Sequence, residues 1–187
     1  MGGRLGQTGE QIAIAGSPTP RSREVEIGAH VFRLPSLEDR LLISTLQRMY
    51  RHFYIRLCDV VDTAQVLESD DIHYPRLRTC RSEGLWEGLS TYLCIVSDYV
   101  EWYRGTQISL PSAVTMAGRF GSDQISFSKK FLRIPILPRS VSLYATELKR
   151  LMLNGELRNT LCLSLLPCLA PAAALEFNIT GSDKGIW

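Results

Sequence analysis

The sequence lacks a strong charge of either sign. Its 187 residues carry 21 Lys and Arg against 19 Asp and Glu, which leaves a formal net charge of +2 at pH 7. A chain so close to neutral does not hold nucleic acid by bulk electrostatic attraction, although a local basic face is compatible with it. With 45% hydrophobic and 21% charged residues, most of the chain is expected to fold, and its length fits one domain with a genuine core.

The sequence also lacks paired cysteines. Its five cysteines are odd in number, and no two have C-x-x-C spacing: Cys58, Cys80, Cys94, Cys162 and Cys168. This pattern predicts buried thiols in a reducing cytoplasm. It argues against a disulfide framework and against a structural zinc site.

A long uninterrupted apolar run is missing as well. The N-terminal residues have no continuous apolar core of the kind that a secretion signal needs. Residues 157–177 are the most apolar segment, but Arg158 and Asn159 open it and Pro167 and Pro171 interrupt it. Because lipid cannot satisfy the carbonyl groups that proline frees, we expect a buried helix here and not a membrane span.

The paired-acid motif Asp-x-Asp, which holds two metal ions in many phosphoryl-transfer enzymes, is absent from the chain. The nearest imitation is Gly16-Ser17 followed by Glu24 and Glu26. Only six residues separate Ser17 from Glu24, which leaves no room for the helix that would have to lie between them. The chain therefore lacks the metal clamp of in-line phosphoryl transfer.

What the chain does contain is helical periodicity. Apolar residues recur at steps of three and four between residues 37 and 68, with Ser36 as a plausible N-cap. Because this stretch is long for a single globular helix, we expect a break or kink near His52–Tyr54. Further helices are predicted between 69 and 84 (short), at 85–104, at 111–118, near 141–153 and from 157 onward.

Two stretches alternate as strands do. Val25 and Ile27 alternate with charged residues, and the pattern resumes after a turn, so residues 24–34 predict a short β-hairpin. Such a hairpin is marginal alone and needs something to pack against. Residues 124–137 alternate more weakly, and Pro135 confines any strand there to an edge or an extended connector.

The predicted fold class is therefore mainly α. We expect one helical bundle-like domain over residues 23–177, with the hairpin at 24–34 as its small β element. Residues 1–22 and 178–187 are rich in turn-forming residues and are expected to be a flexible leader and a flexible tail.

Charged residues interrupt the apolar stripe of residues 48–69. Arg56, Asp59 and Asp62 stand three apart and lie near one helix face, with His52 adjacent. Carboxylates so placed could ligate a hard cation such as magnesium, and arginine suits phosphate. The alternative is intrahelical pairing of Arg56 with Asp59 on a solvated face, which contributes about 0.2–0.5 kcal/mol.

A family resemblance bears on this choice. A strand leads into a helix start at Pro35-Ser36, an Arg/Leu/Cys-Asp run follows at residues 56–59, and Gly84-Leu85-Trp86 opens a later helix. Over residues 24–104 this pattern resembles the helical half of bacterial nucleotidyltransferase-like proteins of the DNA polymerase β type, which include relatives of abortive-infection toxins. The Gly-Ser turn and paired acids of the family's catalytic sheet have no counterpart here.

The resemblance implies a helical substrate- or partner-binding portion of a nucleotidyltransferase-like protein. In it Arg51, Arg56, Asp59 and Asp62 would face a nucleotide, an acceptor substrate or the missing sheet. No residue of this chain is assigned a catalytic or metal-ligating role, since magnesium binding would need a complete catalytic core. A truncated relative, a misassigned start and a helper of a separate catalytic half all stay open.

A second hypothesis comes from a different class: a helical protein–protein interaction module with no nucleotide chemistry. The expected partners are therefore a nucleotide or another protein. Neither hypothesis involves a membrane, and the sequence gives no strong signal for nucleic acid.

Overall fold

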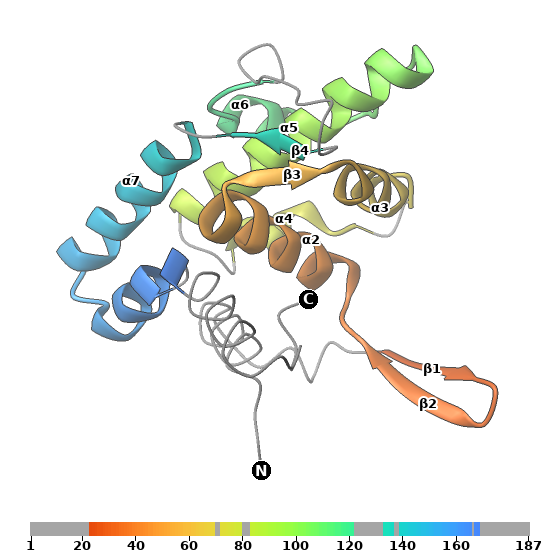
Figure 1. The fold of residues 1–187 in the computed structure, drawn as a ribbon, viewed down its shortest axis with the longest axis horizontal. Helices are drawn as coiled ribbons and strands as arrows, with labels where there is room; N and C mark the ends of the chain where they lie inside the picture. The colour runs from red at the N-terminus through yellow and green to blue at the C-terminus, as the bar shows by residue number, and fades with distance from the viewer. Residues whose placement is uncertain are drawn as a thin grey trace, which may run out of the picture.

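The protein is described here by a computed structural model, over residues 23–69, 72–79, 83–121, 133–136, 139–165 and 167–168. Within these ranges the fold is mainly α-helical with a small hairpin at the N-terminal end, which confirms the predicted fold class (Figure 1). The predicted leader and tail lie outside the described residues.

The N-terminal strands form the predicted hairpin. β1 (Arg23–Ile27) pairs antiparallel with β2 (His30–Leu34), with Val25 opposite Phe32. Gly28 turns the chain with φ +63°, a conformation that glycine adopts without steric cost. Figure 1 shows the hairpin projecting away from the helices.

The predicted helix break is present. α2 (Leu37–Thr45) begins at Ser36, whose Oγ accepts a hydrogen bond from the Asp39 N–H at 3.2 Å. It continues as a π-helix, η2 (Leu46–His52), which ends at Phe53 in the left-handed region (φ 56°, ψ 30°). The chain then forms a strand, β3 (Tyr54–Arg56), before α3 (Leu57–Leu67). The apolar period predicted the break but not the strand inside it.

The longest of the described helices is α5 (Glu83–Arg104), which runs through the middle of the helical body (Figure 1). Leu89, Tyr92, Leu93 and Val96 on this helix are fully buried. The short helix α4 (Tyr74–Thr79) precedes it. Both helices were predicted, and Gly105 closes α5 with φ +73°.

A second small sheet forms far along the chain. β4 (Arg133–Pro135) pairs antiparallel with β3, and the buried Ile55 lies opposite the buried Ile134. The segment predicted at 124–137 is described only in part, and that part supplies this strand. α6 (Ser112–Ala117) precedes it and α7 (Arg139–Leu153) follows, both close to their predicted positions.

The apolar segment that begins at residue 157 differs from its prediction. Its described residues are helical, but only Leu163 is buried, whereas Leu157, Leu161 and Leu165 are exposed. The prediction of a buried helix is wrong for these residues, because this helix turns one face inward, where the Tyr144 hydroxyl of α7 donates to the Leu163 carbonyl at 3.1 Å. None of the described helices is both long and apolar enough to span a membrane.

Candidate functional site

Three consecutive elements bring the charges of residues 48–59 together. η2 carries Arg48 and Arg51, the left-handed turn at Phe53 redirects the chain, and Arg56 precedes the first turn of α3, where Asp59 lies. The segment is therefore folded back on itself and does not present its charges along one straight helix. We call Arg48, Arg51, His52, Arg56 and Asp59 the arginine cluster.

Asp59 is the centre of the arginine cluster. Its Oδ2 lies 2.8 Å from Arg48 Nε, and its Oδ1 accepts a hydrogen bond from Arg56 Nη2 at 2.8 Å. Oδ2 also accepts the backbone N–H of Arg56 at 2.8 Å, which completes a cap at the start of α3. The side chains of Arg48 and Asp59 are buried, and that of Arg56 is partly exposed.

The bond to Asp59 raises the pKa of the Arg56 guanidinium, so this guanidinium stays charged at any physiological pH. Both oxygens of the Asp59 carboxylate thus accept hydrogen bonds from arginine. A hard cation needs such oxygens as ligands, so the magnesium ligation that the spacing of Asp59 and Asp62 suggested does not fit at Asp59. Among the described residues no group of three or more His, Cys, Asp or Glu side chains could hold a metal ion.

Helix α5 contacts the arginine cluster through Tyr92. The Tyr92 hydroxyl lies 2.8 Å from the Thr63 hydroxyl and donates to the backbone carbonyl of Asp59 at 3.3 Å. Burial raises the pKa of Tyr92 well above its ordinary value, so this hydroxyl keeps its proton. The position of Asp59 is therefore fixed by contacts to two helices.

His52 lies beside the arginines in a half-buried position. Its pKa is lowered to about 4, mainly by burial and then by the positive charges of Arg48, Arg51 and Arg56. The carboxylate of Asp59 opposes them with a smaller effect. Its ring lies 5.5 Å from the ring of Tyr54, between centroids, and the Arg48 guanidinium carbon is 5.8 Å from the Tyr54 centroid. His52 is thus neutral at pH 7 in a surrounding of net positive charge.

The four predicted site residues are only partly brought together. Arg56 and Asp59 are bonded to each other, and Arg51 is buried close enough to His52 to lower its pKa. Asp62 is exposed one turn further along α3. The predicted set omitted Arg48, whose contact with Asp59 crosses the break in the helix and so cannot be found from helical spacing.

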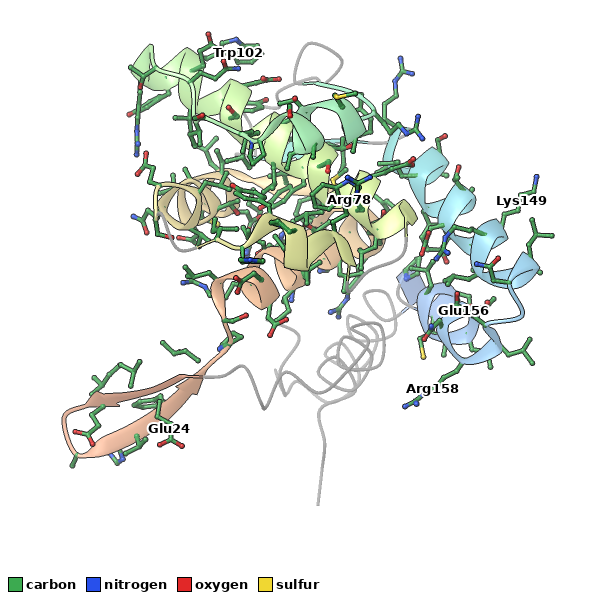
Figure 2. The ribbon with its side chains drawn as sticks, turned by 180° about the vertical axis from the view of Figure 1, so that it is seen from behind. Glu24, Arg78, Trp102, Lys149, Glu156 and Arg158 are labelled. Atoms are coloured by element: carbon green, nitrogen blue, oxygen red, sulfur yellow. The ribbon has the colours of Figure 1, made fainter. Side chains whose placement is uncertain are left out.

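A second candidate site is the hairpin. Residues opposite each other in an antiparallel pair share a face, so the register places four apolar residues on one side: Val25, Ile27, Phe32 and Leu34. We call these the apolar face of the hairpin. Glu24 and Glu26 lie on the other side (Figure 2 labels Glu24).

The apolar face of the hairpin is open to solvent among the described residues. Ile27 is 62% exposed and Phe32 is 46% exposed, and none of the four residues belongs to the hydrophobic core. Single exposed apolar residues are ordinary, but a contiguous set on a projecting element is typical of an interaction surface.

Comparison of the chain with protein-family models, with curated proteins and with solved structures finds no match. The resemblance to nucleotidyltransferase-like proteins therefore stays a prediction.

Proposed function

We propose that this chain is a helical protein–protein interaction module and that the β1–β2 hairpin is its binding element. The supporting observation is the exposed apolar face on a hairpin that projects from the helical body (Figure 1). A two-stranded hairpin is marginal in water by itself, and added strands or a packed partner stabilise it. Binding of a partner chain would supply that stabilisation and would cover part of the exposed apolar side chains.

The arginine cluster fits a structural role within this proposal. The Asp59 carboxylate joins η2 to α3 through two arginines, and Tyr92 ties the same point to α5. These contacts join three elements of the helical body. They leave the hairpin as the element that projects toward a partner.

Two matched double variants test the proposal. Ile27→Lys with Phe32→Lys removes two residues of the apolar face, and Met152→Lys with Leu153→Lys makes the same charge change at the exposed end of α7. The tagged full-length chain and both variants are used to isolate bound proteins from the source cells, followed by mass spectrometry. We expect one protein to be lost with the hairpin variant and retained with the α7 variant, and circular dichroism to show both variants folded.

The same experiment can overturn the proposal. It fails if the unmodified chain recovers no partner and does not associate with itself in solution, or if every such interaction is retained by the Ile27→Lys, Phe32→Lys variant. The purified partner must also bind the purified chain, since co-isolation alone does not establish a direct contact.

A second candidate function is the nucleotide-facing helical portion of a nucleotidyltransferase-like protein. It is supported by three arginines close to a neutral histidine, a surrounding that attracts phosphate. Calorimetric titration with a nucleoside triphosphate, with and without magnesium, tests it. Heat that disappears in Arg56→Ala supports this function, whereas no heat at millimolar ligand overturns it.

For either function we propose the cytoplasm as the place of action. The cysteines described by the structure, Cys58, Cys94, Cys162 and Cys168, are all free thiols, but none of them is buried, so the prediction of buried thiols is wrong for these residues. A reducing compartment keeps such thiols from oxidising.

A further inference from the structure

The hairpin has two strand edges, and neither is paired with a third strand among the described residues. An open edge carries backbone N–H and C=O groups that can bond another strand. Three or more strands with a hydrophobic face are needed for a sheet to be stable independently. The observed hairpin has the hydrophobic face but only two strands.

The two strand edges differ in how well each can pair with the same strand of a second copy of the chain. If β1 paired antiparallel with β1 of a second copy about Val25, Glu24 would lie opposite Glu26 in each half. Like charges directly opposite each other destabilise a sheet. The β1 edge therefore disfavours a second copy of itself.

The β2 edge accepts a second copy of itself. Antiparallel pairing about Phe32 uses all five residues of the strand and places the two Phe32 residues opposite each other. His30 then lies opposite Leu34, and Val31 opposite Arg33, so no like charges are paired. Aromatic residues opposite each other are a favourable cross-strand pair.

Resting on the proposed role of the hairpin, we infer that its partner is a second copy of this chain, which adds its β2 antiparallel to β2 across a two-fold axis. The product is a four-stranded sheet in the order β1–β2–β2–β1. Residues directly opposite each other share a face, so the apolar faces of the two hairpins join into one. A two-fold pairing of this kind is closed, as most homodimers are.

The antiparallel register separates the two helical bodies. β2 leads directly into the helical body after Leu34, while His30 lies at the far end near the turn (Figure 1). Antiparallel pairing places Leu34 of one copy beside His30 of the other, so the two bodies lie at opposite ends of the sheet. Only the five residues of β2 pair with the second copy, whereas a standard stable interface has about 20–30 residues a side. We therefore expect a weak dimer that forms at roughly tens to hundreds of micromolar chain.

Cysteine cross-linking tests the register. In the proposed sheet the two residues at position 32 are on adjacent strands, about 5 Å apart, whereas the two β1 strands are separated by three strand spacings, about 14 Å. A disulfide needs Cα atoms within about 7 Å. Under mild oxidation Phe32→Cys should form a covalent dimer through residue 32, identified by mass spectrometry of the linked peptide. Ile27→Cys, on the comparably exposed β1, should not.

Sedimentation equilibrium of the unmodified full chain completes the test. We expect a monomer–dimer equilibrium that Phe32→Lys weakens at least tenfold and that Met152→Lys leaves unchanged. A chain that stays monomeric at 500 micromolar (about the top of the range expected for so small an interface), or cross-linking of Ile27→Cys as fast as that of Phe32→Cys, overturns the inference. Growth beyond the dimer also overturns it, since this indicates β1–β2 pairing into open chains.

Failure of this inference can be told apart from failure of the proposed function. If the chain is monomeric but a different protein binds in a manner that depends on Ile27 and Phe32, the inference fails and the proposed function stands. If the chain is monomeric and no hairpin-dependent partner is found, both fail.

Discussion

Arg48 Nε lies 2.8 Å from Asp59 Oδ2, and this contact joins η2 to the first turn of α3 across the left-handed residue Phe53. Both side chains are buried, so the pair is screened little by solvent. Removal of either partner would leave a buried charge without a counter-charge, and such a charge is strongly destabilising.

Asp59→Ala should therefore lower the free energy of unfolding by about 3–5 kcal/mol, since it strands the buried Arg48 guanidinium and removes the cap of α3. The control is Asp62→Ala, the same change at an exposed position of the same helix, which should cost less than about 0.5 kcal/mol. Urea denaturation followed by circular dichroism measures both. Equal stability of the two variants would contradict the structural role of Asp59.

Gly88→Ala should destabilise the protein even though alanine is the better helix former. An added Cβ would lie 2.7 Å from ring carbons of Tyr50, a fully buried side chain whose hydroxyl is fixed by a 2.7 Å hydrogen bond to the Gly84 carbonyl. Overpacking of this kind costs about 1–3 kcal/mol, more than the gain in helix propensity of about 1 kcal/mol.

Gly118→Ala provides the comparison for Gly88→Ala. The one tight contact of its Cβ would be with the Cys94 sulfur, at 3.1 Å, and that side chain is half-buried and can shift; the Thr115 carbonyl oxygen, at 3.6 Å, would be in ordinary contact. Its effect on thermal unfolding should be smaller than that of Gly88→Ala, within about 1 kcal/mol of the wild type. A greater loss of stability for Gly118→Ala than for Gly88→Ala would contradict the prediction that the Tyr50 ring leaves no room for a side chain at position 88.

At position 53, glycine should be better tolerated than alanine. Phe53 has φ 56°, and its ring makes an edge-on contact with Tyr144 at 6.0 Å between centroids. Both truncations lose that contact equally, so the difference between them isolates the backbone. Phe53→Gly should be more stable than Phe53→Ala by about 1 kcal/mol, because a residue with a Cβ is strained in this region. The reverse order would mean that the left-handed turn is not kept in the variants.

The stability of the protein should fall between pH 7 and pH 5 in part because of His52. Its pKa is about 4 in the folded protein against 6.5 when exposed, so the unfolded chain takes up the proton first as pH falls. After a discount for its partial exposure, this contributes about 1 kcal/mol of lost stability at pH 5. The His52→Asn variant should show a correspondingly smaller difference between urea unfolding at pH 7 and at pH 5. If the difference between pH 7 and pH 5 is the same in His52→Asn as in the wild type, the loss of stability comes from other titratable groups.

Local sequence determined much of the backbone. The hairpin at residues 24–34, the cap at Ser36, the break near His52–Tyr54 and the helix end at Gly105 all follow from properties of a few adjacent residues. Side-chain branching, the positive φ of glycine and the competition of serine for backbone N–H groups act within one or two turns of chain. For that reason they can be predicted without knowing what lies next to the segment.

Only the tertiary structure decided which distant groups meet. The strand at Tyr54–Arg56 exists because Arg133–Pro135 lies beside it, and no local preference of either segment selects the other. Asp59 was predicted as a ligand-facing carboxylate, but the turn at Phe53 brings Arg48 onto it and encloses the pair. Such contacts form because the whole core is buried and desolvated, and residues far apart in sequence contribute to that. Periodicity and spacing describe only neighbouring residues, so they cannot predict these contacts.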